Sequence, residues 1–417
     1  MWRISVYTVV LLAAINSFSY VDRAALALVL PFIQRDLHLS DTALGLVSGL
    51  PFSVCYALGS LPAAYIADRL SRRNLIAIGF AFWSAMTALS GMVTSGLQLA
   101  CARLALGAGE STGLPSMASM IADLFSGRGR AAAFAVIAAS PNIGVLVGFP
   151  AVAWVMHRMG WRAAFFAAGV PGLLLAILFF LTVREPKRRG DGIAGSELSV
   201  STFREGLAFL AGSRSYVLVV IAGALISINI GSFIAWAPTF MMRMLHQSPQ
   251  QVGSYFGTFR GIAGLLGAIF AGVLANALAR RDEVWRVWLP ALAELLLFPA
   301  DALFLFASSP LGWRGGLMLD AVLNSVQIAT TYTLFVSVAK TRTRAASAAI
   351  YFLVCSLVGL TCGPALVGTL NDILRPRLGD GAIRYTMLLA AATSVGAGVA
   401  TLLAARYWKQ DVERANR

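Results

Sequence analysis

The sequence predicts an all-α membrane protein with twelve transmembrane helices in two six-helix halves. Of its 417 residues, 58% are hydrophobic and 12% are charged, whereas roughly 25% of the residues in a soluble domain are charged. The mean hydropathy is +0.75. The hydrophobic residues fall into runs long enough for bilayer helices, which need about 20 apolar residues each. This composition excludes a soluble enzyme with an ordinary charged surface, and it excludes a disordered chain.

Twelve apolar runs are separated by breaks that contain helix signals. We expect Pro31 to end the first span and Ser40 with Asp41 to cap the second. Ser248 and Gln251 have the spacing of a capping box at the start of the eighth. The expected spans are 5–30, 42–67, 74–94, 98–121, 131–157, 161–183, 215–242, 250–279, 286–307, 313–339, 345–373 and 383–407.

The longest polar stretch, 184–214, divides the chain into an N-terminal bundle, 1–183, and a C-terminal bundle, 215–417. We interpret the stretch as a cytoplasmic linker. Four apolar residues in it recur at helical spacing and indicate a short amphipathic helix on the membrane surface. They are Val200, Phe203, Leu207 and Leu210.

The two bundles share an internal repeat. Leu37–Gly45 is similar to Leu245–Gly253 at an offset of 208 residues, and the same offset places Arg72 over Arg280. Two matches at one offset indicate two related halves in parallel topology, a layout of many secondary transporters. A substrate site is then expected between the halves, near the middle of the membrane.

The net charge of +14 comes from 33 Lys and Arg against 19 Asp and Glu. With both termini in the cytoplasm, 22 of these basic residues lie on the cytoplasmic side and 8 on the other side. This asymmetry is the positive-inside bias of membrane proteins. It explains the charge without a nucleic-acid partner.

Two motifs carry a family resemblance. Asp68-Arg69-Leu70-Ser71-Arg72-Arg73, between spans two and three, and Arg103-Leu104-Ala105-Leu106-Gly107-Ala108-Gly109, in span four, are similar to signatures of the major facilitator superfamily. Further stretches resemble its bacterial spinster-like branch, and related organic-anion carriers share several of them. These stretches are Tyr20–Arg23, Ala67–Arg69, Gly107–Glu110, Gly160–Phe166, Val183–Pro186 and Gly363–Gly368.

The resemblance implies the major facilitator fold and proton-driven transport of lysophospholipids, sphingoid phosphates or related amphiphiles. It implies alternating access, a location in the bacterial inner membrane, a monomer, and no cofactor. The chain departs from the loop signature at Ala64 and Ser71, where glycines are usual, and Asn276 replaces the acid in the second half. The second copy of the charged gate is therefore expected to be weak.

Charged residues inside spans are expensive, about 3 kcal/mol each on insertion scales, so they indicate function. We expect Asp22 and Glu110 to be the proton-coupling acids. Arg23 would bind an anionic head group or switch between the acids, with Asn16 and Tyr20 on the same helix face. The alternative is a fixed structural ion pair between spans one and four.

In the second half, a polar stripe in span ten is expected to face the substrate cavity. Its members are Asp320, Asn324, Gln327 and Thr331. Phe233, Trp236 and Tyr351 are expected either to line an apolar part of that cavity or to pack toward lipid. Glu294 and Asp301 in span nine are interpreted as interfacial or packing groups.

The loop motif predicts a gate. Asp68 with Arg72 and Arg73 is expected to form a cytoplasmic latch of carboxylate–arginine bonds. The same gating group includes Arg69, Arg280, Arg281 and Arg103. Arg103 is expected to be structural and to extend its charge toward the outer membrane surface.

Several chemistries are not indicated. His38, His157 and His246 lack ligand spacing, so no metal site is predicted. No P-loop or nucleophile constellation is present, so neither an ATP-driven pump nor an enzyme is expected. Alternatives to a lipid carrier are a carrier of small organic anions, a drug–proton antiporter, or a non-transporting membrane sensor.

Overall fold

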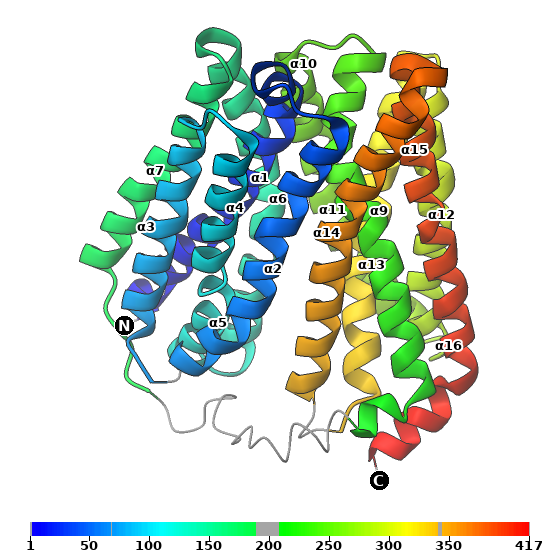
Figure 1. Ribbon diagram of the computed structural model, residues 1–417. Helices are drawn as coiled ribbons and strands as arrows, with labels where there is room; N and C mark the ends of the chain where they lie inside the picture. Colours follow the sequence, from blue (N-terminus) through cyan, green and yellow to red (C-terminus); the bar gives the residue numbers. More distant parts are fainter. Residues whose placement is uncertain (1, 68, 189–207, 341–343, 417) are drawn as a thin grey trace. The chain divides into compact units, whose positions relative to one another are not determined.

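The computed structural model describes residues 2–67, 69–188, 208–340 and 344–416, and every regular element in that part of the chain is a helix (Figure 1). The chain divides into two compact units, Met1–Gly195 with Ala237–Gly261, and Ser196–Trp236 with Ile262–Arg417. The proposed boundaries of the two halves remain a prediction.

Unit 1 consists of the helices within Met1–Gly195 and of two short helical elements that follow the linker, within Ala237–Gly261. They are α1 (Trp2–Leu37), α2 (Asp41–Ala67), α3 (Arg72–Ser90), α4 (Gly96–Glu110), α5 (Gly113–Leu124), α6 (Gly127–Met159), α7 (Trp161–Thr182), α10 (Pro249–Ser254) and the π-helical η2 (Tyr255–Arg260). Helix α9 (Arg214–Met244) begins in unit 2 and ends in unit 1.

The remaining elements belong to unit 2. They are α11 (Gly261–Ala279), whose first residue is still counted with unit 1, α12 (Trp285–Phe306), α13 (Pro310–Ser337), α14 (Arg344–Leu378), η4 (Gly379–Gly381), α15 (Ala382–Ala391) and α16 (Thr393–Asn416). Inside this unit α12 packs against α13 and α16, and α14 packs against α15.

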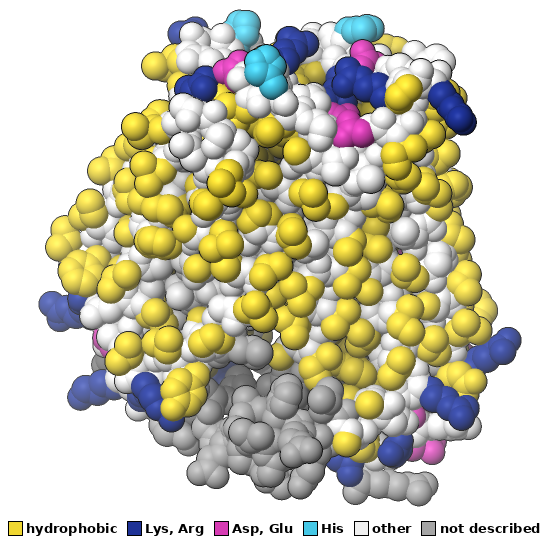
Figure 2. Space-filling model, viewed as in Figure 1, with side chains coloured by type: hydrophobic (Ala, Val, Ile, Leu, Met, Phe, Trp, Pro, Cys, Tyr) yellow, Lys and Arg dark blue, Asp and Glu magenta, His cyan; other side chains and the backbone are white. Residues whose placement is uncertain are grey.

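Eight stretches of the described chain are long and apolar enough to cross a bilayer. One of them, Ser347–Ala415, covers most of α14, all of α15 and nearly all of α16. Helices α3, α4–α5 and α13 occupy the positions of three further predicted spans. The order of helices is therefore that of the predicted twelve-span membrane protein. In Figure 2, hydrophobic side chains cover the middle of the visible face, and charged and His side chains lie toward its two ends.

The expected end of the first span at Pro31 is wrong. Helix α1 continues through Pro31 to Leu37. Proline removes one backbone hydrogen bond, but membrane helices tolerate it because neighbouring groups satisfy the freed carbonyl. The extension places Asp22 and Arg23 near the middle of the helix rather than close to its end.

Span four is broken where the sequence predicted one helix. Helix α4 ends at Glu110 and α5 begins at Gly113. In the two residues between them, the Ser111 hydroxyl donates to the carbonyl of Ala108 and the Thr112 hydroxyl donates to that of Gly109. These side chains bond to backbone groups beside the break, which permits an interruption at membrane depth.

The repeat extends to backbone geometry. His38 and His246, separated by the 208-residue offset, both have a φ of 51°. Ser40 accepts a hydrogen bond from the amide of Ala43, and Ser248 forms the expected capping box with Gln251. The two matched segments therefore end one helix and start the next by the same geometry.

Close backbone packing holds unit 1 together. A Cβ on Gly107 would lie 2.4 Å from the Phe52 carbonyl oxygen, so α2 and α4 can meet this closely only because the residue is glycine. A second seam joins α6 to α10 and η2. A Cβ would lie 2.3 Å from the Ala153 Cβ at Gly253 and 2.4 Å from the Pro150 Cδ at Gly257.

The predicted amphipathic helix of the linker falls mostly on residues 189–207, outside the described part of the chain. Leu210, the last residue of that pattern, is fully buried. It belongs to an apolar cluster of unit 2 that also contains Tyr216 and Trp408. This end of the linker is therefore anchored by packing.

Candidate functional site

Two ion pairs connect α1 to α4 inside unit 1. An Nη atom of Arg103 lies 2.6 Å from the carboxylate of Asp22, and one of Arg23 lies 2.8 Å from that of Glu110. The Arg103, Asp22 and Glu110 side chains are 2%, 4% and 8% exposed, while Arg23 is 24% exposed. Of the four groups, Arg23 is the one that an incoming solute can reach most readily.

Neutral groups complete this charged cluster. The Thr87 hydroxyl donates to the Asp22 carboxylate at 2.8 Å. The Arg23 guanidinium lies over the rings of Tyr20 and Phe52, 4.9 and 5.2 Å from their centroids. Phe52 also lies beneath Arg103, at 5.4 Å. The faces of aromatic rings attract cations, so these rings hold both guanidinium groups in place.

The expectation that Arg103 extends to the membrane surface is wrong. Its side chain is buried and paired with Asp22. A long side chain reaches the surface only when no acid inside the bundle compensates its charge, and here Asp22 provides that compensation. Asp22 and Arg23 are adjacent in α1, and the structure pairs each of them with a different residue of α4.

Asn16 lies on α1 but contacts another helix. Its side-chain amide donates to the Ser140 hydroxyl at 2.8 Å and to the Ile137 carbonyl at 3.3 Å. These bonds join α1 to α6. Asn16 therefore contributes a helix–helix contact beside the charged cluster, whereas Tyr20 contacts Arg23 directly.

Two acids and two arginines balance each other in this cluster, so its net charge is zero while both pairs remain intact. Each arginine neutralises an acid that is too buried to be stable alone as an anion. An anion that takes the place of one acid at its arginine would leave that acid to bind a proton. The geometry can therefore couple anion binding to protonation.

A second polar network lies just after the C-terminal end of α2, where the sequence predicted a gate. Arg72 is buried and pairs with Asp123 on α5 and, at 2.8 Å, with Glu185 after α7. Asp68, the acid of the expected latch, lies outside the described residues. Arg69 instead stacks on Tyr65, 3.5 Å from its ring centroid.

Glu185 also accepts hydrogen bonds from the backbone amide of Arg73, at 2.7 Å, and from the Ser71 hydroxyl, at 2.9 Å. Partial burial raises the pKa of Glu185, but the bonds from Arg73, Arg72 and Ser71 lower it more. The pKa of Glu185 is therefore below its usual range, and the carboxylate is charged at neutral pH. This acid ties the segment after α7 to the start of α3.

The second copy of the gate differs from the first. Arg280 and Arg281 are exposed in the turn after α11 and form no ion pair with any described residue. This agrees with the replacement of the acid by Asn276.

Three aromatic residues, expected either to line a cavity or to pack toward lipid, are buried among helices of unit 2. Phe233 packs against Phe304, with ring centroids 5.1 Å apart. The Trp236 indole donates to the Pro364 carbonyl at 3.0 Å, and Tyr351 stacks on Phe335 at 4.4 Å. Within unit 2 these rings connect α9, α12, α13 and α14.

The polar stripe of α13 is also buried. Asp320, Asn324, Gln327 and Thr331 are between 2% and 8% exposed. The Gln327 amide donates to Thr331 at 3.1 Å and lies 3.4 Å from the carboxylate of Glu294 on α12. Gln327 of the stripe therefore contacts α12, the helix of predicted span nine, whose acids were interpreted from the sequence as interfacial or packing groups. Asp301 on the same helix accepts a hydrogen bond from Asn229.

One further link in unit 1 was missed from the sequence. Arg243, at the end of α9, donates to both carboxylate oxygens of Asp41, at 2.8 and 2.9 Å, and to Gln34 at 2.6 Å. Asp41 had been assigned to helix capping alone. A sequence signal for this link did exist. Arg243 at the end of span seven and Asp41 at the start of span two both lie on the predicted membrane side that has few basic residues.

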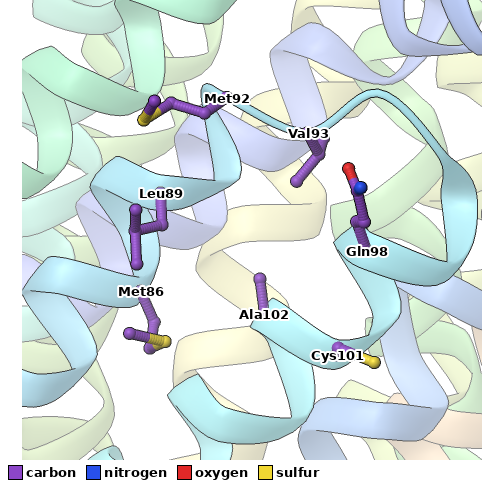
Figure 3. Close-up of a pocket in the computed structure, with 7 residues that line it drawn as sticks. All are labelled: Met86, Leu89, Met92, Val93, Gln98, Cys101 and Ala102. Carbon is purple, nitrogen blue, oxygen red and sulfur yellow. The ribbon is translucent and has the colours of Figure 1, made fainter.

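An open groove of about 360 Å³ lies on unit 1 between α3 and α4. Figure 3 shows its lining residues, which are mostly apolar: Met86, Leu89, Met92, Val93, Gln98, Cys101 and Ala102. The residues of the two ion pairs do not line it. The groove is therefore distinct from the charged cluster.

Comparison with known proteins places these features in a family. The family model of the Major Facilitator Superfamily matches residues 12–361. An MFS-type efflux pump of Mycolicibacterium smegmatis is 30% identical over 406 residues, which cover 97% of this chain and 94% of the pump. The sphingosine-1-phosphate transporter SPNS2 of Danio rerio is 25% identical over 424 residues, covering 96% of this chain and 84% of that protein.

The fold agrees with these matches. The crystal structure of a bacterial homologue of the human lysosomal transporter Spinster, in an inward-facing and unoccupied conformation, has a TM-score of 0.86 to this chain. It is 22% identical and the match covers 98% of each chain. The resemblance to spinster-like carriers is thereby confirmed. The family match over most of the chain and the common helical architecture make this multi-pass membrane protein a transporter of the Major Facilitator Superfamily.

Proposed function

We propose that the protein is a proton-coupled carrier of an amphiphilic, anionic, lipid-like substrate of the lysophospholipid type. In this proposal it works by alternating access, as a monomer, in a bacterial inner membrane with both termini in the cytoplasm. The observation that carries the proposal is the pair of buried ion pairs between α1 and α4, in which Arg23 is the accessible member.

The coupling step follows from the unequal exposure of the two pairs. An anionic head group that binds Arg23 competes with Glu110 for the same guanidinium. Glu110, 8% exposed, would then be a buried carboxylate without its cation. An unpaired buried carboxylate is costly, and binding a proton removes the cost. Substrate binding and protonation of Glu110 therefore favour each other, and Asp22 responds through the second pair.

The aromatic rings beside Arg23 favour a substrate with an apolar part. Tyr20 and Phe52 flank the guanidinium, so a ligand that reaches it also contacts ring surface. A phosphate ester with an acyl chain has the matching chemistry, an anion joined to hydrocarbon. The similarity to a sphingosine-1-phosphate transporter supports this class of substrate.

Gating is proposed at both ends of unit 1. The Arg72 network with Asp123 and Glu185 would stabilise one state, and the contact of Arg243 with Asp41 would stabilise the closed form of the other end. Arg69 and Arg73 remain in the proposed gating group as chain neighbours of Arg72. Asp68 and Arg103 remain in it on the sequence prediction alone. Arg280 and Arg281 are proposed to have the smaller role.

The test is uptake of a labelled lysophospholipid into proteoliposomes, with and without an imposed pH gradient. We expect gradient-dependent flux in the wild type, loss of the gradient dependence in Glu110→Gln, and wild-type behaviour in Glu283→Gln. Glu283 is a suitable control because its side chain is 66% exposed and lies in a turn. Full gradient-driven flux in folded Glu110→Gln would contradict the coupling role.

A second candidate is a drug–proton antiporter. The similarity to an efflux pump over nearly the whole chain favours it. The same proteoliposomes distinguish the two functions when a cationic dye replaces the lysophospholipid. Dye movement in the direction opposite to the proton flow, with no lysophospholipid flux, would support the antiporter.

A further inference from the structure

Glu294 is a buried acid in unit 2 that the proposed coupling does not use. It lies near the middle of α12 and is 1% exposed. Its Oε2 accepts a hydrogen bond from the Thr401 hydroxyl of α16 at 2.6 Å, and its Oε1 lies 3.4 Å from the Gln327 amide of α13. Both carboxyl oxygens therefore contact other helices of the unit.

The partners of Glu294 are all neutral among the described residues. Asp22 and Glu110 each have an arginine, but no described Lys, Arg or His forms an ion pair with Glu294. On α13 and α16 it meets the amide of Gln327 and the hydroxyl of Thr401, and α15 presents no charged group to it. The titratable group that faces it is Tyr351 of α14, which also interacts with Gln327 and Cys355.

A carboxylate in such a place is unstable as an anion. Moving an unpaired carboxylate out of water costs several kcal/mol, and one or two neutral hydrogen bonds do not recover that cost. A bound proton removes the charge and leaves both oxygens able to take part in hydrogen bonds. The environment of Glu294 is therefore suited to the neutral acid.

Gln327 connects this acid to the polar stripe of α13. Its amide nitrogen donates to Thr331 and faces Glu294. A glutamine side chain can present either a donor or an acceptor, so it can adapt to the neutral or the charged acid. A change along the stripe can therefore reach Glu294 through one side chain.

We propose that Glu294 is a second proton-binding site of this transporter, separate from the arginine-paired acids of unit 1, and that Gln327 is its positioning residue. The ligand is a proton that binds reversibly. The part of Glu294 in the transport cycle rests on the proton coupling proposed above, whereas its ability to bind a proton does not.

Infrared difference spectroscopy of the protein in lipid tests the proton site without any substrate. Protonated carboxylic acids have a carbonyl band that carboxylates lack. We expect the band of the wild type to change reversibly with pH and one component of it to be absent in Glu294→Gln. The exposed control Glu283→Gln should leave the band unchanged above about pH 6, where an exposed glutamate is ionised and has no such band. A Glu294→Gln spectrum identical to the wild type at every pH would overturn the proposal.

Thr401→Val keeps the test decisive when Glu294→Gln does not fold. It removes the hydroxyl donor and preserves the side-chain shape, so the Glu294 component should remain and move to higher frequency. A band that does not move would contradict the assignment to Glu294.

The role in the cycle is measured as protons moved per labelled lysophospholipid in proteoliposomes. Glu294→Gln should lose one proton per substrate relative to the wild type. An unchanged ratio would overturn this role. Absence of flux in the wild type would refute the proposed substrate, and the infrared result would then decide the proton site by itself.

Discussion

Arg243 and Asp41 form a bidentate ion pair, with both carboxylate oxygens of Asp41 within 2.9 Å of the guanidinium. The Asp41 side chain is 1% exposed and that of Arg243 is 14% exposed. The same guanidinium donates to Gln34 at 2.6 Å. The end of α9 is thereby joined to the start of α2 and to α1, and bidentate pairs of this kind are both strong and geometrically specific.

The first prediction concerns this link. Asp41→Asn should weaken the joined state by about 1–3 kcal/mol, which changes its population about 5–150-fold. Spin labels at the exposed positions His38 and His246, in a background without the native cysteines, report the change. We expect a longer-distance population to grow in Asp41→Asn. The control is Asp36→Asn, which removes an exposed pair with Arg162 on the same unit. Equal effects of both variants would contradict the role of Asp41.

The second prediction compares the two intramembrane acids. Asp22→Asn leaves Arg103 buried and unpaired, so it should cost about 3–5 kcal/mol. Glu110→Gln should cost less, because Arg23 is already 24% exposed. Thermal unfolding in detergent measures both. Asp22→Asn combined with Arg103→Met should regain much of the loss, since both buried charges are then removed. A larger loss in Glu110→Gln would contradict this order.

The third prediction follows from Glu185, which has a pKa below its usual range. A lowered carboxyl pKa adds stability above the unfolded value, near 4.5, and that stability is lost as the pH falls through the folded value. Glu185→Gln should therefore be less stable than the wild type by about 1 kcal/mol at pH 5–8, because it loses charge-assisted bonds. The difference should shrink below pH 4.5. The exposed control Glu413→Gln should show no such change, and a difference that grows in acid would contradict the sign.

The fourth prediction tests the hydroxyl of Thr87. Thr87→Val keeps the shape of the side chain but removes the donor to Asp22. A hydrogen bond to a charged group is worth about 1.5–3 kcal/mol, so gradient-driven uptake should fall about tenfold or more. Thr87→Ser retains the hydroxyl and should stay near the wild type. Equal uptake by both variants would show that the bond has no part in coupling.

Much of the architecture could be predicted from the sequence, because bilayer spans are long apolar runs and Lys and Arg mark one side. The prediction failed where one residue type has two structural outcomes. Pro31 can end a helix or lie within one, and its membrane surroundings determine which occurs. The break after Glu110 had a weaker signal, the run of Ser111, Thr112 and Gly113.

The charged residues of the site were identified from the sequence, but the sequence could not show which acid pairs with which arginine. Helical spacing shows which residues share a face on one helix, and Arg103 and Glu110, seven residues apart in α4, share one. It does not determine the rotation of α1 against α4, which pairs Arg103 with Asp22. For the same reason the contacts of Thr87 and Arg243 could not be predicted from the sequence. They depend on tertiary packing between segments distant in the chain.

At the glycine seam of α6 with α10 and η2, one added methyl group would push the helices apart. Gly257→Ala would bring a Cβ within 2.4 Å of a rigid proline ring, and neither side can yield without the helices parting. Such a variant is a tool for holding α6 apart from η2 at this seam. Antibodies raised against the separated form would recognise that arrangement and make it accessible to imaging.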